Sequence, residues 1–239
     1  MLNFGERQIN LGGGIRAIVS KEHTFGADAV LLAHFSRPKA GQRLCDLGTG
    51  CGIIPLLWCA KGGPFAIDAF EIQEQAADIA KRAAEINNLD IHVFNADLRH
   101  IDTLFNNSYD LITCNPPYNR LNAAHLSLGA AAAAARHEVA CTIEDVVATA
   151  AMLLKHGGRL CLCHRPERLT DIVGLMRSSG IEPKRLQFAQ HNRAAKPWLM
   201  LIEGRQGARP GIETQHVLLA AEDDGSVSAE MKAIYGDYN

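Results

Sequence analysis

The chain has 239 residues, of which 47% are hydrophobic and 21% charged, and its formal net charge is −2. This composition is typical of a globular protein, and the near-neutral balance supplies no overall attraction to nucleic acid. No window reaches 18 uninterrupted apolar residues, and "MLNFGERQIN" lacks the basic and apolar stretches of a secretion signal, so we expect a cytoplasmic protein with no membrane contact.

The first 40 residues precede the main fold. "GGGIRAIVS" (12–20) predicts a strand or hairpin, and "TFGADAVLLAHF" (24–35) predicts a helix that begins near Asp28. We expect residues 1–40 to form an N-terminal extension that packs on the sheet of one domain spanning 41–239. There the extension would lie near the ligand of the first glycine turn.

Strands and helices alternate in the next part of the chain. "RLCDLG" predicts a short buried strand that runs into a glycine turn, and "GIIPLLWCA" predicts a helix with its proline in the first turn, where a missing N–H is harmless. Further strands are predicted at 65–70, 91–94 and 109–113, and a helix from Gln73 to Asn87. This order is typical of a doubly wound α/β fold with a parallel sheet.

The remaining elements complete the sheet. Residues 119–138 include six consecutive alanines and predict a partly helical surface excursion. Residues 142–158 predict a helix with a capping box at its start and the pair Gly157–Gly158 as its stop. Later elements are expected as a strand at 159–164, a helix at 166–179, strands at 185–190 and 197–204, and an edge strand at 214–220. We predict a Rossmann-like, mostly parallel, seven-stranded sheet with helices on both faces.

The seven cysteines include no C-x-x-C pair, which argues against a disulfide framework or a zinc ribbon. Alternation along the strand at 159–164 sends Cys161 and Cys163 to one face and His164 to the other. We therefore expect core cysteines and no metal.

Basic residues gather late in the chain, with a single acid, Glu203, among them: Lys184, Arg185, Arg193, Lys196, Arg205 and Arg209. A local basic face and an ordinary solvated surface both account for this distribution.

The stretch "DLGTGCG" (46–52) places Gly48, Gly50 and Gly52 directly after a predicted strand. Alternate glycines let the backbone curl tightly and let a ligand touch the main chain. A dinucleotide site needs G-x-G-x-x-G, and Ile53 occupies the place of its third glycine, which disfavours NAD. Asp46 is poorly suited to a phosphate but suits a ligand with an amino group.

Two acids follow the next two strands. Glu71 ends the second strand, where a carboxylate accepts both ribose hydroxyls, and Asp97 follows the third, where it can meet an adenine amino group. Together with the glycine turn they indicate a nucleoside cofactor, whereas each alone is equally explained as a structural turn or a helix cap.

The stretch "CNPPYN" (114–119) ends the fourth strand, beside the same crevice. Two prolines remove two backbone donors and exclude helix before each, which makes a stiff, extended turn. The turn holds the Asn115 side chain, the carbonyls around Pro116 and the ring of Tyr118. The structural alternative is a proline-stiffened turn with a buried asparagine.

The D-x-G-x-G-x-G turn, the acid after the second strand and N-P-P-Y after the fourth resemble the class I S-adenosylmethionine-dependent methyltransferases that modify amino nitrogens. "FGADAVLLAHF", "DLGTGCGIIPLLW", "NPPY" and "ARHE", in this order, resemble the bacterial tRNA1(Val) (adenine-37-N6)-methyltransferase family over nearly the whole chain. N-P-P-Y is shared with DNA adenine and protein-glutamine methyltransferases, so it identifies the chemistry better than the substrate.

The resemblance implies direct methyl transfer to an adenine exocyclic amine in a tRNA anticodon loop. Asn115 and Pro116 would hold the amine, and Tyr118 would stack on the base. The residues that would bind S-adenosylmethionine are Asp46, Gly48, Thr49, Gly50 and Gly52 at the methionine end, Glu71 at the ribose, Asp97 and Leu98 at the adenine, and Thr24, Phe25 and Asp28 closing the pocket.

Several alternatives stay open. A protein-glutamine N5-methyltransferase of release factors carries a larger helical domain before the glycine turn, and a DNA adenine methyltransferase needs a target-recognition segment. A non-catalytic RNA-binding module of the same fold has no need to keep Asp46, Glu71 and Asp97. The stretch from Arg136 to Glu138 fits an RNA contact or a surface salt bridge equally, and the sequence leaves the oligomeric state open, a monomer included.

Overall fold

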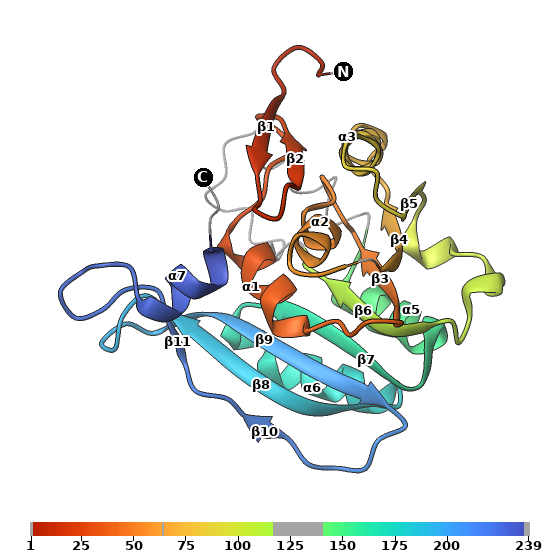
Figure 1. Ribbon diagram of the computed structural model, residues 1–239. Helices are drawn as coiled ribbons and strands as arrows, with labels where there is room; N and C mark the ends of the chain where they lie inside the picture. The colour runs from red at the N-terminus through yellow and green to blue at the C-terminus, as the bar shows by residue number, and fades with distance from the viewer. Residues whose placement is uncertain (1, 64, 117–140, 237–239) are drawn as a thin grey trace, which may run out of the picture.

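A computed structural model describes residues 2–63, 65–116 and 141–236. Its main feature is one large sheet, in which β9 runs antiparallel to its neighbours β7 and β8 and the other pairs are parallel (Figure 1). The strands follow the order β10-β8-β9-β7-β6-β3-β4-β5, with β11 also paired to β8. Their bounds are β3 (Arg43–Leu47), β4 (Ala66–Glu71), β5 (Ile91–Asn95), β6 (Tyr109–Cys114), β7 (Leu154–His164), β8 (Ile181–Gln190), β9 (Pro197–Gln206), β10 (Glu213–Thr214) and β11 (Leu218–Leu219).

The prediction of a doubly wound, mostly parallel sheet is confirmed, but its strand count and last strand need correction. The described sheet has nine strands, because the two-residue strands β10 and β11 both pair with β8 beyond the seven longer ones. The edge strand expected at 214–220 is therefore two short pieces. Residues 215–217 between them are outside any strand.

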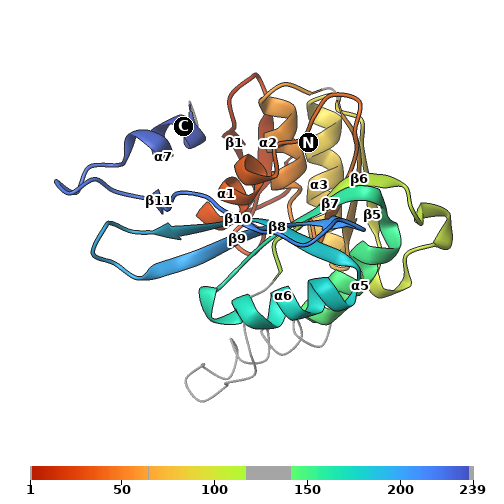
Figure 2. The same cartoon turned by 90° about the horizontal axis from the view of Figure 1, so that it is seen from below.

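Helices cover both faces of the sheet, as predicted (Figure 2). On one side lie α1 (Ala27–Ser36), α2 (Ile53–Ala60), α3 (Glu74–Ile86) and α7 (Ala229–Tyr235). On the other lie α5 (Ile143–Leu153) and α6 (Leu169–Ser178), and short 3₁₀ turns are η1 (Leu98–His100), η2 (Thr103–Phe105) and η4 (Pro166–Arg168). A separate hairpin of β1 (Arg7–Asn10) and β2 (Arg16–Val19) contacts α3, where Arg16 N donates to Asn87 Oδ1 at 2.9 Å.

Alternation along β7 divides the interior into two cores. Cys161 and Cys163 join α1 in the first core, whereas Leu160 and Leu162 join α5 and α6 in the second. This confirms that the two cysteines share one face and are core residues. Helix α1 therefore shares a core with the sheet, while the division of the chain at residue 40 stays a prediction.

The end of the helix predicted over 142–158 is wrong, although its start is right. Asp145 N donates to Thr142 Oγ1 and Thr142 N donates to Asp145 Oδ2, which makes the capping box. Helix α5 ends at Leu153 and the chain continues directly into β7, so Gly157 and Gly158 lie inside a strand. A Cβ on Gly158 would stand 2.9 Å from the carbonyl oxygens of both Lys155 and Tyr109. The two glycines therefore do not stop a helix. They allow the irregular start of the β6–β7 pairing, where the register shifts.

The topology gathers the carboxyl ends of four parallel strands at one edge. From β3 the chain moves outward to β4 and β5 and then returns to β6 on the other side of β3. Such a reversal of strand order opens a crevice outside the strand ends, where ligands bind in open α/β sheets. No helix of the described ranges has the length and apolar character needed to cross a membrane.

Candidate active site

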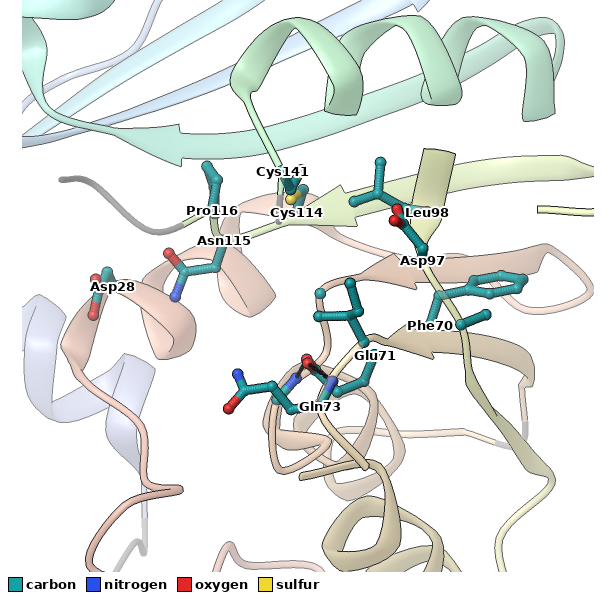
Figure 3. A pocket seen from close by; sticks show the side chains of 14 residues that line it. Asp28, Phe70, Glu71, Gln73, Asp97, Leu98, Cys114, Asn115, Pro116 and Cys141 are labelled. Atoms are coloured by element: carbon teal, nitrogen blue, oxygen red, sulfur yellow. Dashed lines mark hydrogen bonds between the residues drawn. The ribbon is translucent and has the colours of Figure 1, made fainter. Parts of the chain in front are cut away.

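A cavity of about 370 Å³ lies at this edge, between the ends of β3, β4, β5 and β6 and the start of α1 (Figure 3). It brings together eight of the residues predicted from the sequence: Asp28, Gly48, Gly50, Glu71, Asp97, Leu98, Asn115 and Pro116. The ends of four strands and the start of α1 thus meet in one place.

The other predicted residues do not line this cavity. Asp46, Thr49 and Gly52 belong to the same strand end and turn but lie beneath its surface, and Thr24 and Phe25 lie outside the lining. Tyr118 and the stretch 136–138 lie outside the described residues. The roles of all of these residues stay predictions.

The glycine turn offers bare backbone to the cavity. Gly48 and Gly50 have φ values of 67° and 57°, a region that residues with a Cβ rarely adopt. A Cβ built on either would meet no atom within 4 Å, so it would project into open space that a ligand can fill. At Gly52 a Cβ would lie 3.1 Å from Ala80 Cβ, so this third glycine serves the close approach of α3.

Glu71 fixes the shape of the adjoining wall. Its carboxylate is 4% exposed and accepts two backbone N–H groups, Gly50 N on Oε2 and Gln73 N on Oε1, both at 2.8 Å (Figure 3). Each carboxylate oxygen has a second lone pair available. Glu71 therefore stiffens the glycine turn and can still accept hydroxyl donors from a ligand.

Asp46 is a buried carboxyl with an unused oxygen. It is 1% exposed, and Thr113 Oγ1 donates to its Oδ1 at 2.6 Å, while Oδ2 has no hydrogen-bond partner in the described part of the chain. Burial raises the pKa of Asp46 to about 7, with a smaller rise from the charge of Glu71. A cation brought to the turn would favour the ionised form.

Asp97 is held in place by Arg99. The guanidinium donates to both carboxylate oxygens, and Arg99 N donates to Oδ1 at 3.0 Å at the start of η1. These hydrogen bonds lower the pKa of Asp97, so it is anionic at neutral pH. Next to it, Leu98 is buried and gives the cavity an apolar surface.

Asn115 lines the cavity on the β6 side, with Asp28 of α1 beside it (Figure 3). Its Oδ1 accepts a hydrogen bond from Cys163 Sγ at 3.1 Å. Pro116, directly after it, is buried and also lines the cavity. The amide is thus at the cavity wall, not turned away from it.

The cavity is acidic. Asp28, Glu71 and Asp97 line it, and its described lining contains no lysine, arginine or histidine. A pyrophosphate would be repelled here, whereas a ligand with positive groups is favoured. This agrees with the absence of a G-x-G-x-x-G turn.

Six lining residues were not predicted from the sequence. Phe70, Ile72, Gln73 and Ala96 lie close in the chain to predicted residues, so their place at a strand end was the available signal. Cys114 and Cys141 also line the cavity, while Cys114 belongs to the core, as expected for the cysteines, and Cys141 packs against it. The six late basic residues do not form one face: Arg185 is inside, paired with Glu203 at 2.7 Å, and Arg205 lies at the opposite end of β9 from its turn with β8. Across the described ranges, His, Cys, Asp and Glu side chains form no group that could hold a metal.

Comparison with known proteins places these features in context. The family model described as methyltransferase small domain matches residues 16–171. A tRNA1(Val) (adenine(37)-N6)-methyltransferase of Serratia proteamaculans is 31% identical, over 89% of this chain and 82% of its own length. One of Parabacteroides distasonis is 28% identical, over 89% of both chains. A solved structure from Agrobacterium tumefaciens, titled a predicted O-methyltransferase, superposes with a TM-score of 0.71 at 20% identity, over 87% of this chain and 95% of its own, which shows the shared fold.

Proposed function

Because the chain belongs to the methyltransferase small domain family, we propose that it methylates the N6 atom of an adenine in tRNA, adenine 37 of tRNA1(Val), with S-adenosylmethionine as donor. The observation that carries the proposal is Asn115 on the wall of an acidic cavity, opposite a bare glycine turn and Glu71. The names of relatives at 28–31% identity over most of their length support the choice of substrate.

The residues of the cavity fit the donor. S-adenosylmethionine, when bound, supplies an electrophilic methyl group on a positively charged sulfur. The backbone of Gly48 and Gly50 leaves room for its methionine part, and the unused oxygen of Asp46 offers a partner for the ammonium group. The Glu71 carboxylate would accept the ribose hydroxyls, and Leu98 would pack against the adenine ring; both residues line the cavity.

Asn115 and Pro116 would orient the target amine. An adenine amine is a poor nucleophile because its lone pair is delocalised into the ring. If Asn115 Oδ1 and the Pro116 carbonyl each accept one N–H, the nitrogen is drawn toward tetrahedral geometry and its lone pair points at the donor. Catalysis then rests on alignment and electrostatics, without a strong base before transfer.

The target base must leave its stack to enter the cavity. This costs a few kcal/mol in a duplex and less in a loop, which favours an anticodon loop as the site. Tyr118 follows the prolines in sequence and would stack on the base, worth roughly 1–3 kcal/mol by analogy with single-strand binders.

Nucleoside mass spectrometry of total tRNA from cells with and without the gene tests the proposal. We expect N6-methyladenosine at position 37 of tRNA1(Val) to vanish without the gene and to return when the gene is restored. An unchanged amount would reject the tRNA substrate, and loss of methylglutamine from release factors instead would support the protein-glutamine alternative.

A further inference from the structure

The neighbour of Asn115 in the sheet is a buried thiol. Cys114 pairs with Leu162 in the register of β6 and β7, so Asn115 stands level with Cys163 one residue further along. Cys163 is fully buried, and its Sγ donates to Asn115 Oδ1 at 3.1 Å. The contact thus joins a core side chain to an amide on the cavity wall.

We propose that Cys163 is a positioning residue that fixes the orientation of the Asn115 amide, an inference that rests on the proposed function. The two ends of an asparagine amide have nearly the same shape, but one accepts hydrogen bonds and the other donates them. A thiol donor on one side favours the oxygen there. An amide oxygen has two lone pairs, so it can accept an N–H of the substrate amine as well as the thiol.

Loss of the thiol would remove a donor that favours the present orientation over the opposite one. An amide rotated by half a turn presents its NH₂ group where the substrate amine also presents N–H, so two donors would face each other. The target nitrogen would then lose one of its two acceptors. The binding of S-adenosylmethionine, on the other side of the cavity, should hardly change.

Cys161 provides a matched control for simple packing loss. It lies two residues earlier on the same face of β7, belongs to the same core and is also fully buried. Its Sγ lies 3.6 Å from Glu203 Oε2. Cys161→Ala therefore removes a thiol that is equally buried but contacts Glu203 instead of Asn115.

The first test compares Cys163→Ala, Cys163→Ser and Cys161→Ala in kcat and KM for tRNA1(Val), with cofactor Kd from calorimetry. We expect Cys163→Ala to lower kcat roughly 5- to 50-fold with cofactor Kd within about twofold, since one oriented hydrogen bond is lost. Cys163→Ser, which keeps a donor, should recover most of kcat, and Cys161→Ala should keep it within about twofold. Normal kcat in Cys163→Ala, or no recovery with serine, would overturn the inference.

A second readout does not depend on activity. The side-chain amide resonances of Asn115, in ¹⁵N-labelled protein, should shift or broaden in Cys163→Ala and stay in place in Cys161→Ala. Unchanged resonances in both variants would refute the positioning role even if tRNA is methylated. Wild-type protein that methylates no tRNA, yet shows the selective resonance change, would reject the proposed function and leave the link between Cys163 and Asn115 standing.

Discussion

At the residue scale, a carboxylate on the cavity wall and one buried beneath the glycine turn differ in their pKa values. Asp97 is anionic because Arg99 lowers its pKa, whereas burial raises the pKa of Asp46 to about 7. Asp46 therefore changes its charge near neutral pH, where the enzyme would work. If Asp46 receives the ammonium group of the cofactor, as proposed, the affinity for the cofactor depends on pH.

We expect the affinity for S-adenosylmethionine to fall as the pH drops from 7 to 5.5. The raised pKa means that Asp46 takes up a proton through this range, and only the ionised form attracts an ammonium group. An α-amino group is already protonated below pH 7, so the loss reflects Asp46 and amounts to about tenfold or slightly more in Kd. Calorimetric titration at several pH values measures it.

The Asp46→Asn variant is the control for this pH dependence. It should bind the cofactor weakly at every pH and with little slope. The stability of the fold should follow the opposite trend. Because the folded state binds the Asp46 proton more tightly than the unfolded chain does, the contribution of this carboxyl to the free energy of unfolding falls as the pH rises from about 4 to 7. A pH-independent Kd for the wild-type protein would contradict the role given to Asp46.

At the element scale, a buried ion cluster anchors the carboxyl end of α1. Glu203 Oε2 accepts from Arg159 Nη1 at 3.0 Å and from Arg185 Nη2 at 2.7 Å. The same arginines donate to the carbonyls of Ser36 and Phe35 in the last turn of α1. Helix α1 carries Asp28 at its other end, so the cluster supports one wall of the cavity.

The Glu203→Gln variant should be destabilised by roughly 3–5 kcal/mol, because two guanidinium groups lose the charge that compensates their burial. Urea denaturation measures the change. The control is Asp223→Asn, which removes the partner of Arg193 from an ion pair whose side chains are more than 70% exposed. That variant should stay within about 0.5 kcal/mol of the parent, and an equal effect of both would contradict the anchoring role.

Two glycines of neighbouring elements should respond to alanine in opposite directions. On β9, a Cβ at Gly204 would lie 2.6 Å from Ile181 Cγ2 and would also collide with Met176 Cε, so Gly204→Ala should cost about 1–3 kcal/mol by overpacking. In the exposed middle of α6, Gly174 has open space around it, so Gly174→Ala should stabilise by about 0.5–1 kcal/mol. Thermal unfolding of both variants checks the pair.

Sequence patterns within a few residues predict most of the helices and strands, but not where one element ends and the next begins. The capping box of Thr142 and Asp145 was readable because both partners lie within one turn. The pair Gly157–Gly158 predicts a helix stop, but the positive φ of Gly157 suits a helix end and a strand irregularity alike, and the pairing of β7 with β6 decides between them. In the site, Glu71 could be predicted because it directly ends a predicted strand. The contact of Cys163 with Asn115 could not, because it depends on the register between two strands that are distant in the sequence.

At the scale of the whole molecule, the reversal of strand order between β3 and β6 creates the cavity, and α1 closes one side. The described lining is acidic and has no basic residue. The protein should therefore distinguish nucleosides by charge: a cationic sulfonium ligand is attracted, and a polyphosphate is repelled.

Thermal unfolding with ligands tests this discrimination. S-adenosylmethionine at 100 times its Kd should stabilise the folded state by about 2.7 kcal/mol and raise Tm accordingly. ATP at the same concentration should give no measurable shift, although it shares the adenosine part. A comparable shift with ATP would contradict the charge argument.

Methyl transfer by wild-type protein and by Asn115→Ala, measured side by side, tests the central claim most directly. Labelled S-adenosylmethionine is supplied with tRNA1(Val) lacking the modification, and cofactor Kd is measured on the same samples. We predict label at N6 of adenine 37 with the wild type, and transfer at least about 100-fold slower with Asn115→Ala at an unchanged cofactor Kd. An exposed-site variant, Asn106→Ala, should behave as the wild type. No labelled adenine with the wild type, or full transfer by Asn115→Ala, would contradict the account.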